Sequence, residues 1–211
     1  MSIQTRLLPT NTTKHPGTGP VIPDLCLFNH FDTRRYPYLL SSSASRQNNT
    51  QYDILIACPQ YLLTLDSGRV LRCTNTDINL AQGFFDTLEQ LYQHEKKPEA
   101  DVRPELPFTG GWFVYLSYEM VEEIEPCLSL PDLPAGQPLA VAARCPAAII
   151  HDKQSNQLIA VAEDGYAYLL DEMEQDYLKI TAQLKQKETG EQNEKAIAIN
   201  SLLEAESQPY L

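Results

Sequence analysis

The sequence has no apolar run close to the roughly 20 residues that a bilayer-spanning helix requires. Its first twenty residues contain three prolines and two glycines but no apolar segment typical of a secretory signal peptide. Basic residues are also scarce, because 16 Lys and Arg against 28 Asp and Glu give a formal net charge of -12. Recognition of phosphates depends on clustered Lys and Arg. We therefore expect a cytoplasmic protein that contacts neither membranes nor nucleic acids.

The patterns that hold a metal or a disulfide framework are missing as well. The five cysteines are an odd number and none forms a Cys-x-x-Cys pair. The four histidines are scattered, without a second ligand at metal-binding spacing. These features predict reduced, mostly buried thiols and no metal site or cofactor in this chain. The cysteines are Cys26, Cys58, Cys73, Cys127 and Cys145.

Motifs for a catalytic nucleophile or a bound nucleotide are also absent. The sequence contains no Gly-x-Ser-x-Gly elbow and no Gly-x-x-x-x-Gly-Lys phosphate loop. One carboxylate cluster, Glu119, Glu122, Glu123 and Glu125, has residue types suited to acid–base work or to Mg²⁺. No other catalytic residue type accompanies it, which favours a solvated helix face or an interdomain contact. We predict no catalytic residue in this chain.

The most informative stretch that is present covers residues 107–119, which hold two glycines, the only tryptophan and a run of apolar residues. Enrichment in aromatics and Val between Pro and Gly predicts a strand buried on both faces. The pair Gly110 and Gly111 indicates a backbone position where a side chain would not fit. A short helix over 118–125 follows, ended by Pro126.

The remaining pattern predicts an α+β domain with a mainly antiparallel sheet flanked by helices. The 211 residues suffice for one generous domain with tails. Residues 1–20 are interpreted as a loose N-terminal arm with a short strand near 3–8, and 21–187 as the folded domain. Within it the pattern predicts strands over 36–43, 52–58, 61–65, 139–151 and 157–163, a hairpin turn at 66–68, and helices from 23–24, over 79–95 and around 169–184.

Three stretches carry a resemblance to a known family. The first is residues 108–119, Phe-Thr-Gly-Gly-Trp-Phe-Val-Tyr-Leu-Ser-Tyr-Glu; the second is residues 38–42 followed by 51–57; the third is residues 144–152. In order and spacing they resemble the N-terminal domain of component I of aminodeoxychorismate synthase. That protein belongs to the chorismate-utilising family together with anthranilate synthase component I. The resemblance spans about residues 25–165.

The resemblance implies that this chain is one half of a two-domain body, with one sheet face left open for the other half. In the family, chorismate and Mg²⁺ bind in the C-terminal domain, where aminodeoxychorismate enzymes also place a lysine within Pro-Ile-Lys-Gly-Thr. This sequence contains no such segment. Residues 188–211 are then a linker and the start of a missing chorismate-binding domain. The expected partners are that domain and a glutamine amidotransferase subunit (component II), and the chain alone is expected to be inactive.

The resemblance also implies a pocket that holds tryptophan. Anthranilate synthases line their tryptophan site with a Leu-Leu-Glu-Ser segment, whose glutamate is replaced here by Ser41. Carried over by position, the pocket residues are Leu40, Ser42, Asn49, Thr50, Gln51, Tyr52 and Asp53. Two alternatives stay open, namely the equivalent domain of anthranilate synthase component I and a stand-alone amino-acid-binding module without enzymatic activity.

Overall fold

The structure is a computed structural model of the 211-residue chain. Everything below concerns the residues that it describes, which are 3–9, 22–41, 52–81, 83–96, 105–125, 127–131, 133–134 and 136–186. No helix in these ranges combines the length and apolar character that a membrane span requires.

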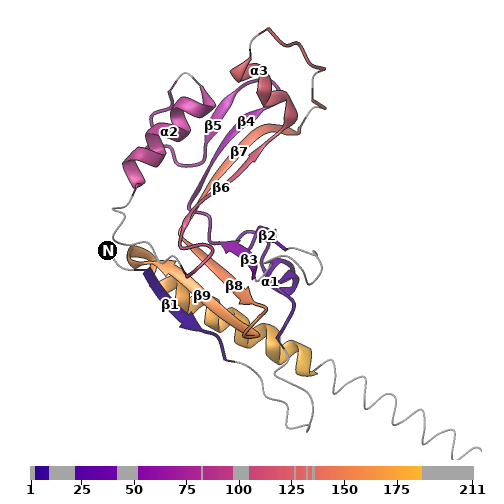
Figure 1. Cartoon of the computed structure of the whole chain (residues 1–211), viewed down its shortest axis with the longest axis vertical. Coiled ribbons are helices and arrows are strands. Elements are labelled where there is room, and N and C mark those ends of the chain that lie inside the picture. Colours follow the sequence, from indigo (N-terminus) through magenta and orange to yellow (C-terminus); the bar gives the residue numbers. More distant parts are fainter. Residues whose placement is uncertain are drawn as a thin grey trace, which may run out of the picture.

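The elements form two antiparallel sheets flanked by helices, which confirms the predicted α+β class (Figure 1). The strands are β1 Ile3–Leu7, β2 Tyr38–Leu40, β3 Tyr52–Ala57, β4 Tyr61–Asp66, β5 Leu71–Cys73, β6 Gly111–Leu116, β7 Pro138–Cys145, β8 Ala147–Asp152 and β9 Gln157–Glu163. The helices are α1 Cys26–Phe31, α2 Phe84–Glu95, α3 Val121–Ile124, the 3-10 turns η2 Tyr118–Met120 and η3 Asp164–Tyr166, and a C-terminal helix over residues 168–186.

The five-stranded sheet, in the order β1-β9-β8-β3-β2, forms the lower lobe of Figure 1. Helix α1 and the C-terminal helix cover one of its faces. Their side chains Phe28, Met173 and Tyr177 pack against Leu55 and Ile149 of the sheet, all at 2% exposure or less. Because one apolar residue recurs per turn from residue 169 onward, the C-terminal helix presents a continuous apolar stripe to the sheet, as predicted.

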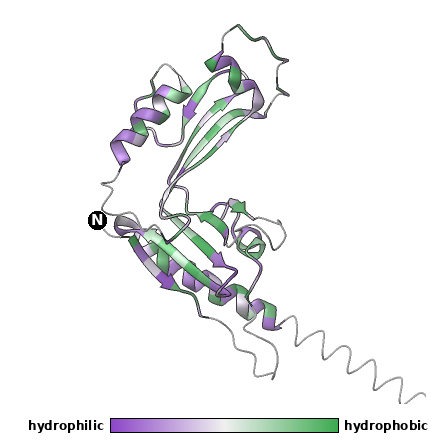
Figure 2. Ribbon diagram, viewed as in Figure 1, coloured by the Kyte–Doolittle hydropathy of each residue, from purple (hydrophilic) through white to green (hydrophobic). Residues whose placement is uncertain are grey.

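The four-stranded sheet, in the order β5-β4-β7-β6, forms the upper lobe. Helix α2 covers its outer face through Phe84 and Leu91, which pack against Leu63 and Ala142. The opposite face carries no helix in the described chain, and it is the side that points toward the lower lobe (Figure 1). Figure 2 shows apolar residues along the strands of both lobes.

The chain passes between the lobes at two neighbouring places, from β3 to β4 and from β7 to β8. We call this region the joint. The predicted strand over residues 139–151 is in fact two strands, β7 in the upper sheet and β8 in the lower one, separated by Pro146. Proline lacks the N–H that a continuous ladder needs, so the strand breaks there. β3 and β4 part in the same way around residues 58–60, and the Gln60 N–H donates to the Arg144 carbonyl at 2.8 Å.

Three other expectations need correction. β6 is not buried on both faces, because its first three residues are half-buried and its last three are exposed; in the sheet it is an edge strand that pairs only with β7. Helix α2 starts at Phe84 rather than 79, since the Thr87 hydroxyl accepts from the Ala81 N–H and donates to the Gly83 carbonyl, which keeps Ala81 and Gly83 out of the helix. The cysteines are not mostly buried. All five are free thiols, of which Cys58 and Cys145 are buried, Cys73 is half-buried, and Cys26 and Cys127 are exposed.

Candidate functional site

The predicted ligand residues divide into two groups in the structure. Ser42, Asn49, Thr50 and Gln51 lie outside the described residues. Leu40, Tyr52 and Asp53 are described, on the adjacent strands β2 and β3. Successive side chains of a strand point to opposite faces. Tyr52 therefore shares a face with Leu40, which lies opposite Ile54 in the β2–β3 register, whereas Asp53 points to the face that α1 covers.

A cavity of about 340 Å³ opens beside Asp53, between the start of α1 and the sheet. This volume lies at the lower end of the range for small-molecule sites. One wall is apolar and the other carries carboxylate, hydroxyl, imidazole and thiol groups. The lining residues are Ile22, Pro23, Asp24, Leu25, Cys26, Leu39, Ser41, Asp53 and His151.

Asp53 is the electrostatic centre of this cavity. Its Oδ1 accepts a hydrogen bond from the Ser41 hydroxyl at 2.8 Å and lies 2.7 Å from Nζ of Lys153. Its Oδ2 lies 3.8 Å from Nδ1 of His151. The antiparallel register places Asp53 directly opposite His151, on the neighbouring strand β8. A carboxylate beside an apolar wall can bind a small molecule that has an amine at one end and an apolar body.

Asp24 holds the entrance of the cavity in shape. Its Oδ1 accepts the Cys26 N–H at 2.8 Å and so starts helix α1. The hydrogen bond to Asp24 also raises the pKa of the Cys26 thiol. The ligand residues predicted from the sequence include Asp53 but not His151 or the residues around Asp24. Those residues become neighbours of Asp53 only through the pairing of β3 with β8 and the packing of α1.

A second polar cluster lies in the joint between the lobes and centres on Arg144 of β7. The Arg144 side chain is buried, and its Nη2 donates to Oε2 of Glu163 at 2.7 Å. Nε donates to Glu95 at the end of α2, and Nη1 donates to the Gly111 carbonyl at 3.2 Å. Tyr61 donates its hydroxyl proton to Glu95. One guanidinium thus ties together both sheets and the helix over the upper sheet.

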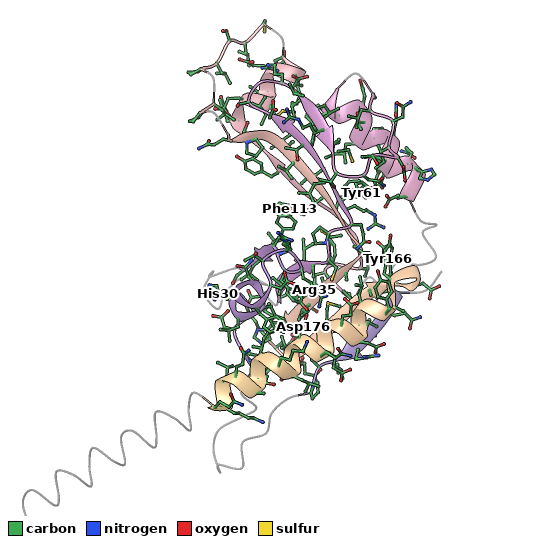
Figure 3. All side chains as sticks on the ribbon, turned by 180° about the vertical axis from the view of Figure 1, so that it is seen from behind. His30, Arg35, Tyr61, Phe113, Tyr166 and Asp176 are labelled. Carbon is green, nitrogen blue, oxygen red and sulfur yellow. The ribbon has the colours of Figure 1, made fainter. Side chains whose placement is uncertain are left out.

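The residues around Arg144, which we call the joint cluster, stabilise the charged form of its guanidinium. Burial alone would lower the pKa of Arg144, but its hydrogen bonds to Glu163 and Glu95 outweigh that effect and raise it. Burial also raises the pKa of Tyr61, and the hydrogen bond to Glu95 adds to the rise. Figure 3 shows Tyr61 at the base of the upper lobe and Tyr166 at the facing edge of the lower one. The cluster is an anchor, because the donors Nε, Nη1 and Nη2 of Arg144 all hold protein acceptors.

The glycine pair of the central stretch belongs to this joint cluster. Gly110 has φ +103°, a conformation that side chains rarely adopt, and a Cβ there would lie 2.5 Å from Cγ of Glu163. The prediction that a side chain would not fit is confirmed at this position. At Gly111, φ is +146° but the space is open. Gly110 is therefore required both by its backbone angle and by the close approach of Glu163.

Two of the four carboxylates in residues 119–125, Glu122 and Glu123, form ion pairs. Arg69, in the turn between β4 and β5, pairs with Glu122 and Glu123. Glu122 also accepts the Leu130 N–H at 2.6 Å, which fixes the segment that follows α3. In the ranges that the structure describes, no group of three or more His, Cys, Asp or Glu residues could hold a metal ion.

Comparisons with known proteins give a limited result. No protein-family model matches the chain, and neither does any curated protein sequence. One solved structure with a partial likeness is anthranilate synthase component I from Streptococcus pneumoniae TIGR4, at 20% sequence identity and a TM-score of 0.46. The match covers 68% of this chain and 32% of that protein. The chain thus corresponds to about a third of that protein's length.

Proposed function

We propose that the chain is the N-terminal scaffold and regulatory domain of a chorismate-utilising enzyme, on the aminodeoxychorismate synthase component I branch. The whole protein would make 4-amino-4-deoxychorismate from chorismate and glutamine-derived ammonia, toward p-aminobenzoate and folate in the cytoplasm. Chorismate and Mg²⁺ would bind in a separate C-terminal domain. This chain would brace that domain and help to present a surface to the glutamine amidotransferase subunit.

One observation carries the proposal: the three stretches that resemble the family meet around a single joint. β6 pairs with β7, and β3 pairs with β8, so residues 108–119, 51–57 and 144–152 are spatial neighbours. Arg144 from the third stretch donates to the Gly111 carbonyl in the first. Gly110 has a backbone angle that suits glycine. Three stretches that meet at one joint support common architecture better than three separate sequence similarities would.

The regulatory part of the proposal concerns the cavity beside Asp53. An amino acid such as tryptophan would place its ammonium group near the Asp53 carboxylate and the Ser41 hydroxyl. Its ring would lie against the apolar wall that Leu25 and Leu39 contribute. Ser42, Asn49, Thr50 and Gln51 remain proposed members of the surrounding site, whereas Leu40 and Tyr52 lie on the opposite face of the sheet from this cavity.

Calorimetric titration with tryptophan tests the ligand. Binding by the wild-type chain, and a loss of roughly tenfold or more in affinity for Asp53→Asn, would support the cavity, because a bond to a charged group is removed. Asp66→Asn is the matched control, since it removes a carboxylate from an exposed pair with Arg72 elsewhere on the surface. A flat titration with ligand-free wild-type protein would remove the tryptophan claim and leave the scaffold claim standing.

An activity assay tests the scaffold. The chain would be mixed with a separately expressed C-terminal domain of aminodeoxychorismate synthase component I and its glutamine amidotransferase, with chorismate, glutamine and Mg²⁺. We expect no turnover by the chain alone and at least a tenfold gain in 4-amino-4-deoxychorismate when the chain is added to the other two. Failure to stimulate that mixture would contradict the proposal.

The same assay separates the two alternatives. Stimulation of an anthranilate synthase C-terminal domain instead, read as anthranilate, would assign the chain to that branch. The amino-acid sequence of residues 112–119 and the serine at position 41 favour the aminodeoxychorismate branch. Tryptophan binding without stimulation of either catalytic domain would favour a stand-alone amino-acid-binding module.

A further inference from the structure

The outer edge of β6 differs from the other three sheet edges of the described fold. β2 and β5 are short edges of three residues each, and β5 carries Arg72. β1 contains Arg6, which pairs with Asp171 and Glu174 of the C-terminal helix. β6 spans six residues, Gly-Trp-Phe-Val-Tyr-Leu, with no charge and no proline. Native sheets protect their edges by shortness, charge or proline, and β6 uses none of these devices.

The outer half of this strand is open to solvent. Val114, Tyr115 and Leu116 are 43%, 46% and 45% exposed, although aromatic and β-branched residues of this kind normally mark covered strands. The inner half is engaged at the joint, where the Phe113 ring stacks on Tyr38 with centroids 3.9 Å apart. Figure 3 shows Phe113 on the side that faces the lower lobe. Only the segment 114–116 is therefore open to another strand.

We infer that β6 is the contact edge of a symmetric dimer, in which a second copy of this chain adds its β6 antiparallel across a twofold axis at Tyr115. The backbone supports this register. The Ser117 N–H donates to the Leu139 carbonyl of β7, so the alternation of an antiparallel ladder points the N–H and C=O groups of Val114 and Leu116 outward. A twofold axis at Tyr115 sets Val114 of one copy opposite Leu116 of the other, which forms four N–H···O=C bonds.

The exposed strip of β6 carries no charge that a basic partner would complement, whereas its apolar side chains match those of a second copy. Of the carboxylates that follow the strand, Glu122 and Glu123 are paired with Arg69, and Glu119 lies beyond the strand end in η2. With a net charge of -12, two copies repel each other across most of their surface. The uncharged strip avoids that repulsion. Antiparallel pairing also places the acidic segments that follow the two copies of β6 at opposite ends of the strand pair, which keeps them apart.

Sedimentation equilibrium is the first test and does not depend on the proposed enzyme. We expect a species of twice the 23.8 kDa chain mass at micromolar concentrations. The dimer should strengthen as salt rises from 0.05 to 0.5 M, because screening weakens the repulsion between like-charged copies. A monomer throughout this range would overturn the dimer.

A charge-swap pair at the axis tests the register. Tyr115→Lys and Tyr115→Glu each put like charges directly opposite one another and should weaken self-association by roughly tenfold or more. An equimolar mixture of the two should restore a dimer, because opposite charges then meet at the axis. Val70→Lys, a 48% exposed apolar position beside β5, is the matched control and should leave the dimer intact. Unchanged self-association of both Tyr115 variants, or a mixture that stays monomeric, would overturn the inference.

Cross-linking tests the distance. In a Cys26→Ser, Cys127→Ser background, Tyr115→Cys places two thiols across the axis at a Cα separation of about 4.5–5.5 Å, which a disulfide can span. Treatment with oxidised glutathione should form a covalent dimer with release of reduced glutathione, and dithiothreitol should reverse it. Val70→Cys in the same background should stay monomeric. Equal cross-linking of both variants, or none at position 115, would contradict the twofold contact.

Discussion

The two sheets are built from similar strands but are completed in different ways. The five-stranded sheet has two helices of its own over one face, and Leu106 and Phe108 pack on the other. Ion pairs from Arg6 and Arg35 fasten the C-terminal helix to it. The four-stranded sheet has α2 over one face and an open edge strand. A strand of this protein is therefore buried when another segment of the chain packs on it, whatever the composition of the strand.

The lobes also differ in how their buried charges are held. In the lower lobe Asp176, at 3% exposure, lies 2.5 Å from Nη1 of Arg35 and 3.0 Å from the Tyr36 hydroxyl, all within one lobe (Figure 3). At the joint, Arg144 instead bridges Glu95 of the upper lobe and Glu163 of the lower one. Loss of the first cluster should weaken one lobe, whereas loss of the second should weaken the contact between lobes.

The largest effect is expected from Arg144→Ala. It removes the guanidinium that the buried Glu163, at 4% exposure, shares with Glu95, and breaking a buried ion pair from one side costs about 3–5 kcal/mol of unfolding free energy. Urea denaturation measures the loss. Arg72→Ala is the control, because its pair with Asp66 is exposed and contributes at most about 1 kcal/mol. Equal losses in the two variants would refute the anchoring role of Arg144.

The second largest effect is expected from Gly110→Ala. Backbone strain and overlap with Glu163 together should lower the free energy of unfolding by about 2–4 kcal/mol. Gly136→Ala separates these two causes, since Gly136 has φ +90° and open space around it. The control should therefore lose only the strain, about 1 kcal/mol. Thermal unfolding of both variants checks the difference, and an equal shift would mean that Glu163 does not crowd Gly110.

Asp176→Asn tests the cluster inside the lower lobe and should cost about 2 kcal/mol, as bonds to a charged acceptor are weakened. The loss should be smaller than at Arg144, because Arg35 is 32% exposed and can be solvated once its partner is neutral. Asp171→Asn, whose side chain is 64% exposed, should cost less than about 1 kcal/mol. Amide hydrogen exchange should become faster in the lower lobe of Asp176→Asn. An equal increase in the exchange rate in both lobes would contradict the comparison.

The smallest effect concerns alkaline pH. Burial raises the pKa of Cys58 and of Cys145 to about 12 from a usual 9.0. A pKa that is higher in the folded than in the unfolded state leaves stability intact below about pH 9, and stability falls as pH rises from there toward 12. At pH 8, a disulfide reagent should react quickly with Cys26 and Cys127 and slowly with the buried pair. Uniform reactivity of all five thiols would show that the joint is open.

Local patterns predicted most of the elements. The apolar repeat from residue 169 identified the C-terminal helix, and the turn at 152–156 between two β-rich runs identified the β8–β9 hairpin. Of the glycine pair at 110–111, Gly110 occupies a position that excludes a side chain, as predicted. These features depend on neighbours in sequence, so the sequence contains enough information to locate them.

Features that depend on distant residues were missed. The aromatic run of β6 was interpreted as a central strand, because composition cannot tell a strand covered on both faces from one left at an edge. The cavity beside Asp53 includes His151, almost a hundred positions away, which only the β3–β8 register brings close. All seven proposed ligand residues remain predictions, and four of them lie outside the described residues.

The sequence by itself determined the α+β class, the positions of most strands and helices, and the need for glycine at position 110. Tertiary structure alone decided which strand became an edge and which charges became buried. Arg144 reads as an ordinary basic residue until chain folding brings Glu95, 49 residues away, and Glu163, 19 residues away, to its guanidinium. The physical reason is that burial of a charge depends on partners and cover, and both are supplied by segments far apart in the chain.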